Sequence, residues 1–301
     1  MSQTVVLFPV ARAAALRGFL ESCGFVSRAA KNAVFSAKGD GLTVTLFRSG
    51  KVLVQGRGAE AFASDRIASL AAGGAPAPET RERPAPPADT GLLIGTDEAG
   101  KGDYFGPLCV AGVALDAEGG DRLSSMGVRD GKTIADPTVL SLDSIIRAEY
   151  PFVVVALDPE EYNRRYAEEE NLNRLLASLH ALVIGELAGK TGAARALTDQ
   201  FADPRVLICA VEKLGIVIDL RQRPRAETET AVAAASIVAR AEFLRRLEAL
   251  ASVGGRRLPK GASDIVDSAA REIHRRGGRE LLRRVAKLHF KTTGKATGLY
   301  P

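Results

Sequence analysis

Two adjacent carboxylates, Asp97 and Glu98, follow the apolar residues 92–94 in the stretch GTDEAGKGDYFGP, residues 95–107. A strand places neighbouring side chains on opposite faces, so both acids serve one site only where the strand ends or bends. The glycines that follow permit such a bend, and Lys101 between them adds a cation. Loops that follow a buried strand often carry binding and catalytic residues. This stretch is therefore the first candidate for a reaction centre.

Further carboxylates stand where other expected elements begin or end. Asp199 closes a short strand expected at residues 195–198, and Glu227 or Glu229 precedes a long helix expected at residues 230–250. Residues two apart on a helix point in nearly opposite directions, so at most one of these glutamates faces the centre, and a first-turn acid also stabilises the helix dipole. Oxygen ligands from several strand ends suit Mg²⁺ or Mn²⁺. Two such ions about 4 Å apart activate water and stabilise the leaving oxygen of a phosphodiester.

The elements that must position these acids alternate between strand and helix. We expect strands at residues 92–96, 108–115, 153–157, 195–198, 206–208 and 216–220. We expect helices at residues 172–187, 230–250, 263–274 and 279–286. The pattern predicts a mixed sheet flanked by helices, so the fold class is α+β with an α/β-like larger part.

A segment rich in alanine, glycine and proline divides the chain. Residues 73–91 have no apolar period and read as a linker between a small part, residues 1–72, and a large part, residues 92–301. The small part reads strand, helix, strands, helix. We expect its strands to form one sheet with the helices packed behind it, which leaves the other sheet face free.

Composition narrows the class of protein. The 301 residues are enough for two domains, and the longest apolar run falls short of the ~20 residues of a membrane span. Neither a secretory signal pattern nor a zinc or disulfide spacing is visible. The three cysteines are far apart in apolar surroundings, which suits a reducing compartment. We expect a cytoplasmic, monomeric protein that does not enter membranes.

Charge is distributed unevenly along the chain. Residues 1–75 hold nine Lys/Arg and four Asp/Glu, residues 76–250 hold 20 and 28, and residues 251–301 hold 12 and four. Basic surface attracts polyanions, of which nucleic acid is the commonest. Acids between basic flanks suit a metal-dependent enzyme on a phosphate backbone, although on charge alone accidental segregation with solvated faces is the slightly better explanation.

Seven short motifs, in the same order along the chain, resemble those of type 2 ribonuclease H, specifically bacterial ribonuclease HIII. The motifs are residues 95–107, Asp130-Gly131-Lys132, Asn171-Leu172-Asn173, Thr198-Asp199-Gln200-Phe201, AAASIVAR at 233–240, LPKGA at 258–262 and AKLHF at 286–290. Each is loose alone, but together they are specific. The GKG triplet favours the HIII type over the HII type, which has GRG. The small N-terminal part is similar to the TATA-binding-protein-like domain of ribonuclease HIII.

The resemblance implies hydrolysis of the RNA strand in RNA/DNA hybrids, leaving a 3′-hydroxyl and a 5′-phosphate. It implies a ribonuclease H-like fold and Mg²⁺ or Mn²⁺, two ions at turnover. The carboxylates that it implies are Asp97, Glu98, Asp199 and Glu227. Glu229 competes with Glu227, because the segment RPRAETET matches the family only loosely.

The same resemblance suggests how substrate is held. Gly100 and Gly102 let the backbone approach a sugar and test for the 2′-hydroxyl that separates RNA from DNA. Lys101 and Lys132 can hold phosphates, or can be solvated. The family usually has serine where Gly131 stands between Asp130 and Lys132, so a serine contact is absent from this motif.

Other residues of these motifs could stabilise the fold rather than contact the substrate. Asn171 and Asn173 either contact nucleic acid or cap the next helix, and we expect capping by at least one of them. Asp103, Tyr104 and Phe105 are expected to brace the turn. His180 is expected at the edge of the core, whereas Lys260 and His289 belong to motifs whose role does not follow from the residues.

Three rival functions remain open on the sequence. A ribonuclease HII-like enzyme would cut at single embedded ribonucleotides. A non-catalytic hybrid-binding protein could keep the fold, although all four carboxylate positions are filled. A metal-dependent DNA recombinase nuclease of the same broad fold would cleave all-DNA duplex.

Overall fold

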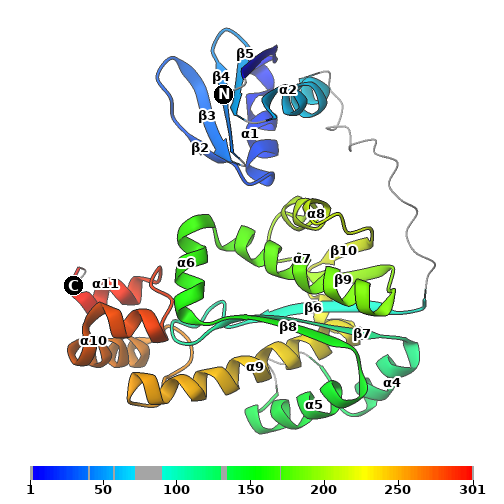
Figure 1. Cartoon of the computed structure of the whole chain (residues 1–301), viewed down its shortest axis with the longest axis vertical. Coiled ribbons are helices and arrows are strands. Elements are labelled where there is room, and N and C mark those ends of the chain that lie inside the picture. The colour runs from blue at the N-terminus through cyan, green and yellow to red at the C-terminus, as the bar shows by residue number, and fades with distance from the viewer. Residues whose placement is uncertain are drawn as a thin grey trace. The chain divides into compact units, whose positions relative to one another are not determined.

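The computed structural model describes residues 3–39, 41–56, 58–71, 90–129, 134–169 and 171–299. The chain divides into two compact units, Met1–Pro84 and Ala85–Pro301 (Figure 1). The predicted linker, residues 73–91, lies outside the described residues except for Thr90 and Gly91, so the predicted domain limits stay a prediction. Within the described ranges, every helix is too short or too polar to cross a membrane.

The first unit is a five-stranded antiparallel sheet in the order β1-β5-β4-β3-β2. Its strands are β1 (Gln3–Leu7), β2 (Val26–Arg28), β3 (Ala33–Gly39), β4 (Leu42–Phe47) and β5 (Lys51–Gly56). Its helices are α1 (Ala13–Ser22), α2 (Ala59–Phe62) and α3 (Ala68–Ala71), with a 3₁₀ turn at Val10–Arg12 and a π turn at Ala63–Ile67. Alternate apolar side chains of β3, β4 and β5 pack against these helices in one core.

No helix or strand among the described residues of this unit covers the other face of the sheet. Strand register aligns Val5, Leu53, Thr45, Ser36 and Arg28 across all five strands, and each of these residues is exposed or half-buried. The predicted arrangement of one sheet with helices behind it is confirmed. Strand β2 was not predicted, because three residues carry too little pattern to be recognised.

The second unit holds a five-stranded mixed sheet in the order β10-β9-β6-β7-β8. Its strands are β6 (Leu93–Ala99), β7 (Leu108–Leu115), β8 (Phe152–Leu157), β9 (Arg195–Asp199) and β10 (Asp219–Arg223). Strands β6, β9 and β10 run parallel, whereas β7 is antiparallel to both of its neighbours. The carboxyl ends of β6 and β9 therefore meet at one edge of the sheet.

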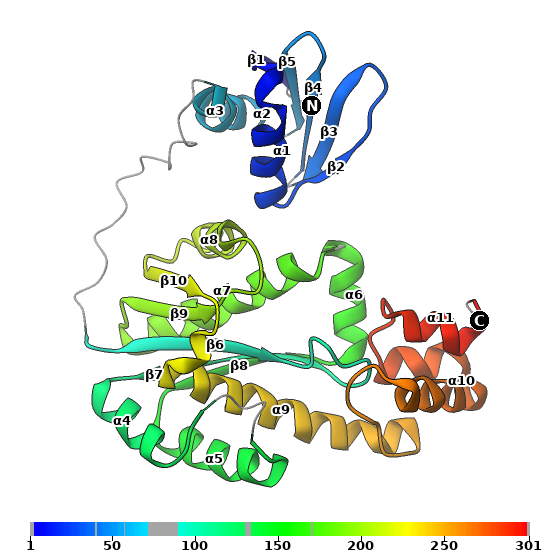
Figure 2. The ribbon, with the colours of Figure 1, turned by 180° about the vertical axis from the view of Figure 1, so that it is seen from behind.

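Helices cover both faces of this sheet, as predicted (Figure 2). One face carries α7 (Leu172–Thr191) and α8 (Pro204–Lys213), and α6 (Pro159–Glu169) lies beside α7. The other face carries α4 (Ala117–Ser125), α5 (Asp136–Glu149) and α9 (Thr230–Gly254). Two further helices, α10 (Asp264–Val285) and α11 (Lys291–Thr297), pack beyond the end of the sheet with the far half of α9. Strand β7 is buried along its whole length between the layers.

One predicted strand is wrong: residues 206–208 belong to α8. Asp203 caps this helix, because its Oδ1 accepts a hydrogen bond from the backbone N–H of Arg205 at 3.0 Å, and Pro204 begins the first turn. Leu207 and Val211, four residues apart, face the core. The apolar run of residues 206–208 was too short to distinguish the period of a helix from that of a strand. The cap residue and the proline before it indicate a helix.

Two strand glycines let the helical layers approach the sheet closely. A Cβ on Gly95 would lie 2.1 Å from the carbonyl carbon of Ala231, on the first turn of α9. On the opposite face, a Cβ on Gly112 would lie 2.6 Å from a methyl group of Val183 on α7. The start of α9 is thus packed directly on β6 at Gly95, which lies two residues before Asp97.

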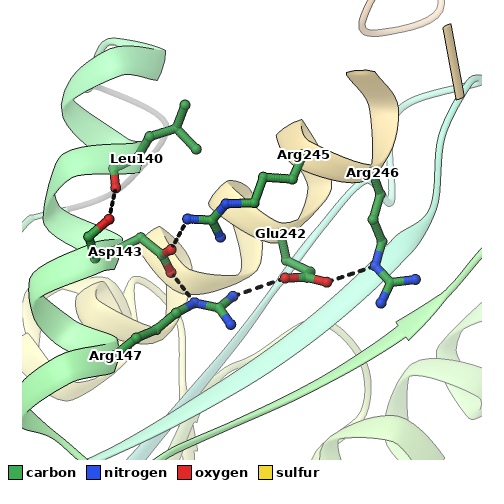
Figure 3. A network of polar contacts seen from close by, with 7 residues as sticks. Leu140, Asp143, Arg147, Glu242, Arg245 and Arg246 are labelled. Atoms are coloured by element: carbon green, nitrogen blue, oxygen red, sulfur yellow. Dashed lines mark hydrogen bonds and ion pairs between the residues drawn. The ribbon is translucent and has the colours of Figure 1, made fainter. Parts of the chain in front are cut away.

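An ion network fastens α9 to α5 (Figure 3). The buried Asp143 accepts hydrogen bonds from Arg147 at 2.8 Å and from Arg245 at 2.5 Å. Glu242 accepts from Arg147 at 3.0 Å and from Arg246 at 2.7 Å. Burial raises the pKa of Glu242, but these two guanidinium groups outweigh burial and lower it. Because each acid has two cationic partners, the network gives α9 a defined position against α5.

Candidate active site

The carboxylates predicted from the sequence come from the edge where β6 and β9 end. Asp97 and Glu98 lie on β6, and Asp199 is the last residue of β9. The last paired residues of the two strands are Thr96 and Thr198, so Asp97 and Asp199 stand at neighbouring positions one step further. The parallel pairing therefore brings together acids that are about a hundred residues apart in the sequence.

Strand alternation decides which face each acid uses. The hydroxyl oxygens of Thr96 and Thr198 lie 2.9 and 3.4 Å from Nδ1 of His180, on the α7 face. Asp97 and Asp199, one residue on, consequently project toward the α9 face, as Gly95 does. Asp97 is almost completely buried there.

The turn before α9 adds a further acid on the same face. The 3₁₀ turn η4 (Ala226–Thr228) places the backbone N–H of Ala226 3.2 Å from Oδ1 of Asp199, to which it donates. Glu227 is the next residue and is half-buried. Glu229 lies beyond this turn, about half exposed, with its carboxylate 3.5 Å from the guanidinium of Arg223. This geometry favours Glu227 over Glu229 as the fourth carboxylate of the site.

Glu98 points to the opposite face and is held by two cationic or hydrogen-bonding partners. Nε2 of His180 donates to its Oε2 at 3.3 Å, and Nζ of Lys101 donates to its Oε1 at 3.3 Å. Burial raises the pKa of Glu98, but His180 and Lys101 outweigh burial and lower it to about 2. The carboxylate is therefore ionised at neutral pH.

His180 is fully buried and organises this side of the site. Because a carboxylate has no proton to give, Nε2 carries the proton toward Glu98, and in the neutral ring Nδ1 accepts from the hydroxyl of Thr96. Its ring stacks on Phe201, with the ring centres 5.0 Å apart. We expected His180 only at the edge of the core; in the structure it is a direct partner of a site acid.

A cavity of about 650 Å³ opens at this edge of the sheet. It is lined by acids from two strands, the glycine-rich loop and the polar side of α9. The lining residues are Glu98, Ala99, Gly100, Lys101, Gly102, Asp103, Asp199, Gln200, Phe201, Ser236, Arg240, Phe243, Leu244 and Lys260. Carboxylates thus stand beside three cations, which is the charge pattern expected for a site that takes phosphate together with metal ions.

The cations of the cavity are tied to acids in the structure. Lys101, besides its contact with Glu98, lies 5.7 Å from the ring centre of Phe201. Asp136, at the start of α5, accepts from Arg240 at 2.5 Å and from Lys260 at 2.6 Å. Burial raises the pKa of Asp136, whereas Lys260 and Arg240 lower it further than burial raises it. Asp136 thus holds both cations at the rim of the cavity.

The two glycines of the GKG triplet are present for different structural reasons. Gly100 has a φ of +86°, and a Cβ there would lie 2.2 Å from the carbonyl oxygen of Pro107, so glycine is needed for the fold. A Cβ on Gly102 would meet no heavy atom of the described chain within 4 Å. Gly102 therefore leaves open space in the cavity rather than permitting a turn.

The structure does not bring every predicted binding residue to this cavity. Asn171 caps α7, because its Oδ1 accepts from the backbone N–H groups of Asn173 and Arg174 at 2.9 and 3.2 Å, so the expected capping is confirmed. Asn173 is exposed on the first turn of α7, and neither asparagine lines the cavity. The motif Asp130-Gly131-Lys132 lies outside the described residues.

Sequence reasoning missed several residues of the site. Four residues that line the cavity had no predicted role there: Phe201, Ser236, Arg240 and Lys260. His180 holds Glu98, which also lines the cavity. Ser236 and Arg240 belong to the motif AAASIVAR and are four residues apart, so they share one side of α9. This spacing could have indicated that both residues face the site. Lys260 lies in a loop, and no local pattern in the sequence predicts where that loop is placed.

The donor set fits a hard divalent cation. Asp97, Glu98, Asp199 and Glu227 offer carboxylate oxygens, and Glu98 is ionised at neutral pH. Within the described residues, no three Asp, Glu, His or Cys side chains are grouped so as to hold a metal ion. The reason lies in side-chain direction, since Glu98 faces His180 and Lys101 while Asp199 faces the N–H of Ala226.

Comparison with known proteins identifies the family. A family model described as Ribonuclease HII matches residues 94–293, and one described as a domain of unknown function matches residues 5–66. The chain is 40% identical to Ribonuclease HIII of Protochlamydia amoebophila over 88% of its length and 86% of that protein's. It is 41% identical to Ribonuclease HIII of Chlamydia pneumoniae, covering 92% of each chain.

Solved structures agree with the sequence relatives. The structure of Bst-RNase HIII in complex with Mn²⁺ matches with a TM-score of 0.65 and 32% identity over 99% of both chains. That of Aquifex aeolicus RNase H3 matches with a TM-score of 0.56 and 26% identity over 95% of this chain and 99% of the other. Both parts of the predicted fold are thus found in one related protein. This chain belongs to the ribonuclease HIII family.

Proposed function

We propose that the cavity at the ends of β6 and β9 hydrolyses the RNA strand of RNA/DNA hybrids and leaves a 3′-hydroxyl and a 5′-phosphate. The observation that supports this most is the pairing of β6 with β9, which places Asp97 beside Asp199 and next to the turn of Glu227. Glu98 and three cations line the same cavity. Family membership and this arrangement point to the same chemistry.

Asp97, Glu98, Asp199 and Glu227 would hold Mg²⁺ or Mn²⁺, with two ions at turnover. When bound, such ions activate a water molecule and stabilise the leaving 3′-oxygen. His180 holds one oxygen of Glu98 and is itself oriented by Thr96, which keeps this carboxylate ionised and in a defined place. Lys101 and Arg240 attract the phosphates on either side of the bond that is cleaved.

Selection of RNA falls to the loop that begins at Gly100. The open space at Gly102 allows a ribose to approach the backbone, whose N–H and C=O groups can bond to the 2′-hydroxyl. A deoxyribose cannot make these bonds. The loop thus distinguishes the strand that is cut from its DNA partner.

The N-terminal unit supplies a second surface for the hybrid. Residues 1–75 carry nine Lys/Arg against four Asp/Glu, and the helices described in this unit leave one face of its sheet uncovered. Two tethered surfaces bind more tightly than either does alone. The cysteines Cys23, Cys109 and Cys209 are not joined in disulfides in the described structure, which is consistent with a cytoplasmic protein, and we propose that it acts as a monomer.

Cleavage of a labelled RNA/DNA hybrid with Mg²⁺, Mn²⁺ or EDTA tests the function. Asp97→Asn, Glu98→Gln and Asp199→Asn should each lower the rate about 10³-fold, since a lost ligand costs several kcal/mol of transition-state stabilisation. Hybrid binding should persist or tighten, because a charge that repels phosphate is removed.

Matched substrates separate the rival functions. Cutting confined to a DNA duplex with one ribonucleotide would indicate a ribonuclease HII-like enzyme, and cutting of all-DNA duplex would indicate a DNA nuclease. Binding without any cleavage would indicate a hybrid-binding protein. Wild-type turnover in one of the three variants would remove that residue from the site.

A further inference from the structure

A segment far along the chain holds the loop Gly100–Pro107 from one side. The backbone N–H of Lys287 donates to the carbonyl of Tyr104 at 2.8 Å, and the N–H of Gly106 donates to the carbonyl of Val285 at 3.0 Å. Phe105 and Ala286 form an antiparallel bridge between these contacts. The motif AKLHF, which had no role on the sequence alone, therefore pairs with the glycine-rich loop.

The side chain of Lys287 adds a second set of contacts. It is fully buried, and its Nζ donates to the carbonyl oxygens of Asp103 at 2.8 Å and Gly106 at 2.7 Å. The ammonium also lies 5.7 Å from the ring centre of Tyr162. Its partners are therefore backbone carbonyls and a ring face, with the two carbonyls three residues apart in one loop.

Such a lysine is expensive to bury. Burial lowers the pKa of Lys287 to about 7, even though Asp103 and Cys109 act in the opposite direction. An apolar side chain of similar length would avoid the desolvation of an ammonium group. Stability alone thus gives little reason for a lysine at this position, whereas the geometry of the loop gives one.

The loop is held from its other side as well. Oδ1 of Asp103 accepts from the backbone N–H of Gly261 at 2.6 Å, and the N–H of Tyr104 donates to the carbonyl of Gly261 at 2.9 Å. Residues 103–106 are therefore fastened on two sides. The stretch Gly100-Lys101-Gly102, between these anchors and the end of β6, lines the cavity.

We propose that Lys287 is a positioning residue, which holds Gly100-Lys101-Gly102 where its backbone reads the 2′-hydroxyl of the substrate ribose. This proposal rests on the proposed function. Loss of Nζ leaves the carbonyls of Asp103 and Gly106 without their donor inside the protein, so the loop must shift to find other partners. A displacement of about 1 Å in a positioned group lowers a rate by about 10²-fold.

Two substrates separate positioning from simple stabilisation. One is an RNA/DNA hybrid, and the other is the same hybrid with 2′-deoxy-2′-fluoro sugars, which lack the hydroxyl proton. The measured quantity is the ratio of cleavage rates, RNA over fluoro sugar, at saturating Mg²⁺. Lys287→Met should lower this ratio at least tenfold, because a shifted loop no longer senses the hydroxyl. The exposed Lys291→Met is the matched control and should keep the wild-type ratio.

The outcomes are distinct. A folded Lys287→Met protein that keeps the wild-type ratio, even at a lower absolute rate, overturns the proposal. If Lys287→Met does not fold, as judged by circular dichroism, Asp103→Ala releases the loop from its other anchor, and the same ratio then decides in the same way. Failure of the wild-type protein to cleave the RNA hybrid would instead refute the proposed function.

Discussion

Gly95→Ala should separate the two halves of the acidic site with little change elsewhere. The added Cβ would lie 2.1 Å from the carbonyl carbon of Ala231 and 2.3 Å from the backbone nitrogen of Val232. An ordinary contact begins at about 3.4 Å, and backbone atoms cannot rotate away. The start of α9 must therefore retreat from β6 by roughly 1 Å.

This retreat moves the turn that carries Glu227 away from Asp97. A misplacement of about 1 Å at a reacting centre costs about 10²-fold in rate, so kcat should fall by that factor while KM changes little. Overpacking destabilises by about 1–3 kcal/mol, which for a unit of this size lowers the melting temperature by roughly 2–12 °C. The apparent affinity for Mn²⁺ should weaken together with kcat.

Gly112→Ala is the matched control on the opposite face of the sheet. Its Cβ would meet the methyl groups of Val183 and Leu187 at 2.6 and 2.7 Å, and such side-chain ends can rotate. We expect a similar loss of melting temperature with kcat within about threefold of wild type. Steady-state cleavage and thermal melts of the three proteins provide the measurement. If Gly95→Ala melts and cleaves like wild type, α9 is not seated on β6 as described and the argument fails.

Three further predictions concern other parts of the chain. Glu227→Gln should lower kcat about 10³-fold while Glu229→Gln changes it little, because Glu227 lies within the turn bonded to Asp199 whereas Glu229 follows the turn and lies beside Arg223; the reverse result in a single-turnover assay would assign the metal ligand to Glu229 instead. Removal of residues 1–75 should leave a folded, metal-dependent nuclease with a raised KM. Its binding should also depend less steeply on salt, because each lost phosphate contact reduces the slope of log affinity against log salt concentration by about 0.9. An unchanged KM and slope with a lowered melting temperature would show that this unit only stabilises the other. The buried Lys287 should make stability depend on pH. Its pKa is lowered to about 7 in the folded protein, so between pH 7 and 9 the unfolded chain binds the extra proton and the free energy of unfolding rises with pH by about 1.4 kcal/mol per unit from this group. Burial lowers the pKa of the neighbouring His289 to about 4, raises the pKa of Cys109 to about 12, and raises the pKa of Tyr162 beyond the usual tyrosine range. Because an unfolded cysteine loses its proton near pH 9, Cys109 opposes the trend from about pH 8 upward. Urea unfolding at pH 7, 8 and 9 should therefore give a shallower rise for Lys287→Met than for wild type, and parallel curves would contradict a buried, readily deprotonated lysine.

The sequence by itself predicted the family and a candidate reaction centre. Asp97, Glu98 and Asp199 were recognised because each stands at the end of an apolar strand, where local pattern and short motifs suffice. The mixed sheet and its two helical layers also followed from periodicity, since the period of apolar residues is a local property. The exceptions included β2, which has only three residues, the helices α4, α5 and α6, which were not predicted, and α8, part of which was predicted as a strand.

Tertiary structure alone decided how these pieces act together. His180 lies on a leucine-rich helix, and only packing of α7 against β6 turns it into the partner of Glu98. The proposal of Glu227 rather than Glu229 rests on a single hydrogen bond between a turn and β9. Lys287 became a partner of the glycine-rich loop, 184 and 181 residues away, only through the fold. The physical reason is common to all three: contacts between distant segments depend on the relative placement of whole elements, which no local pattern of residues records.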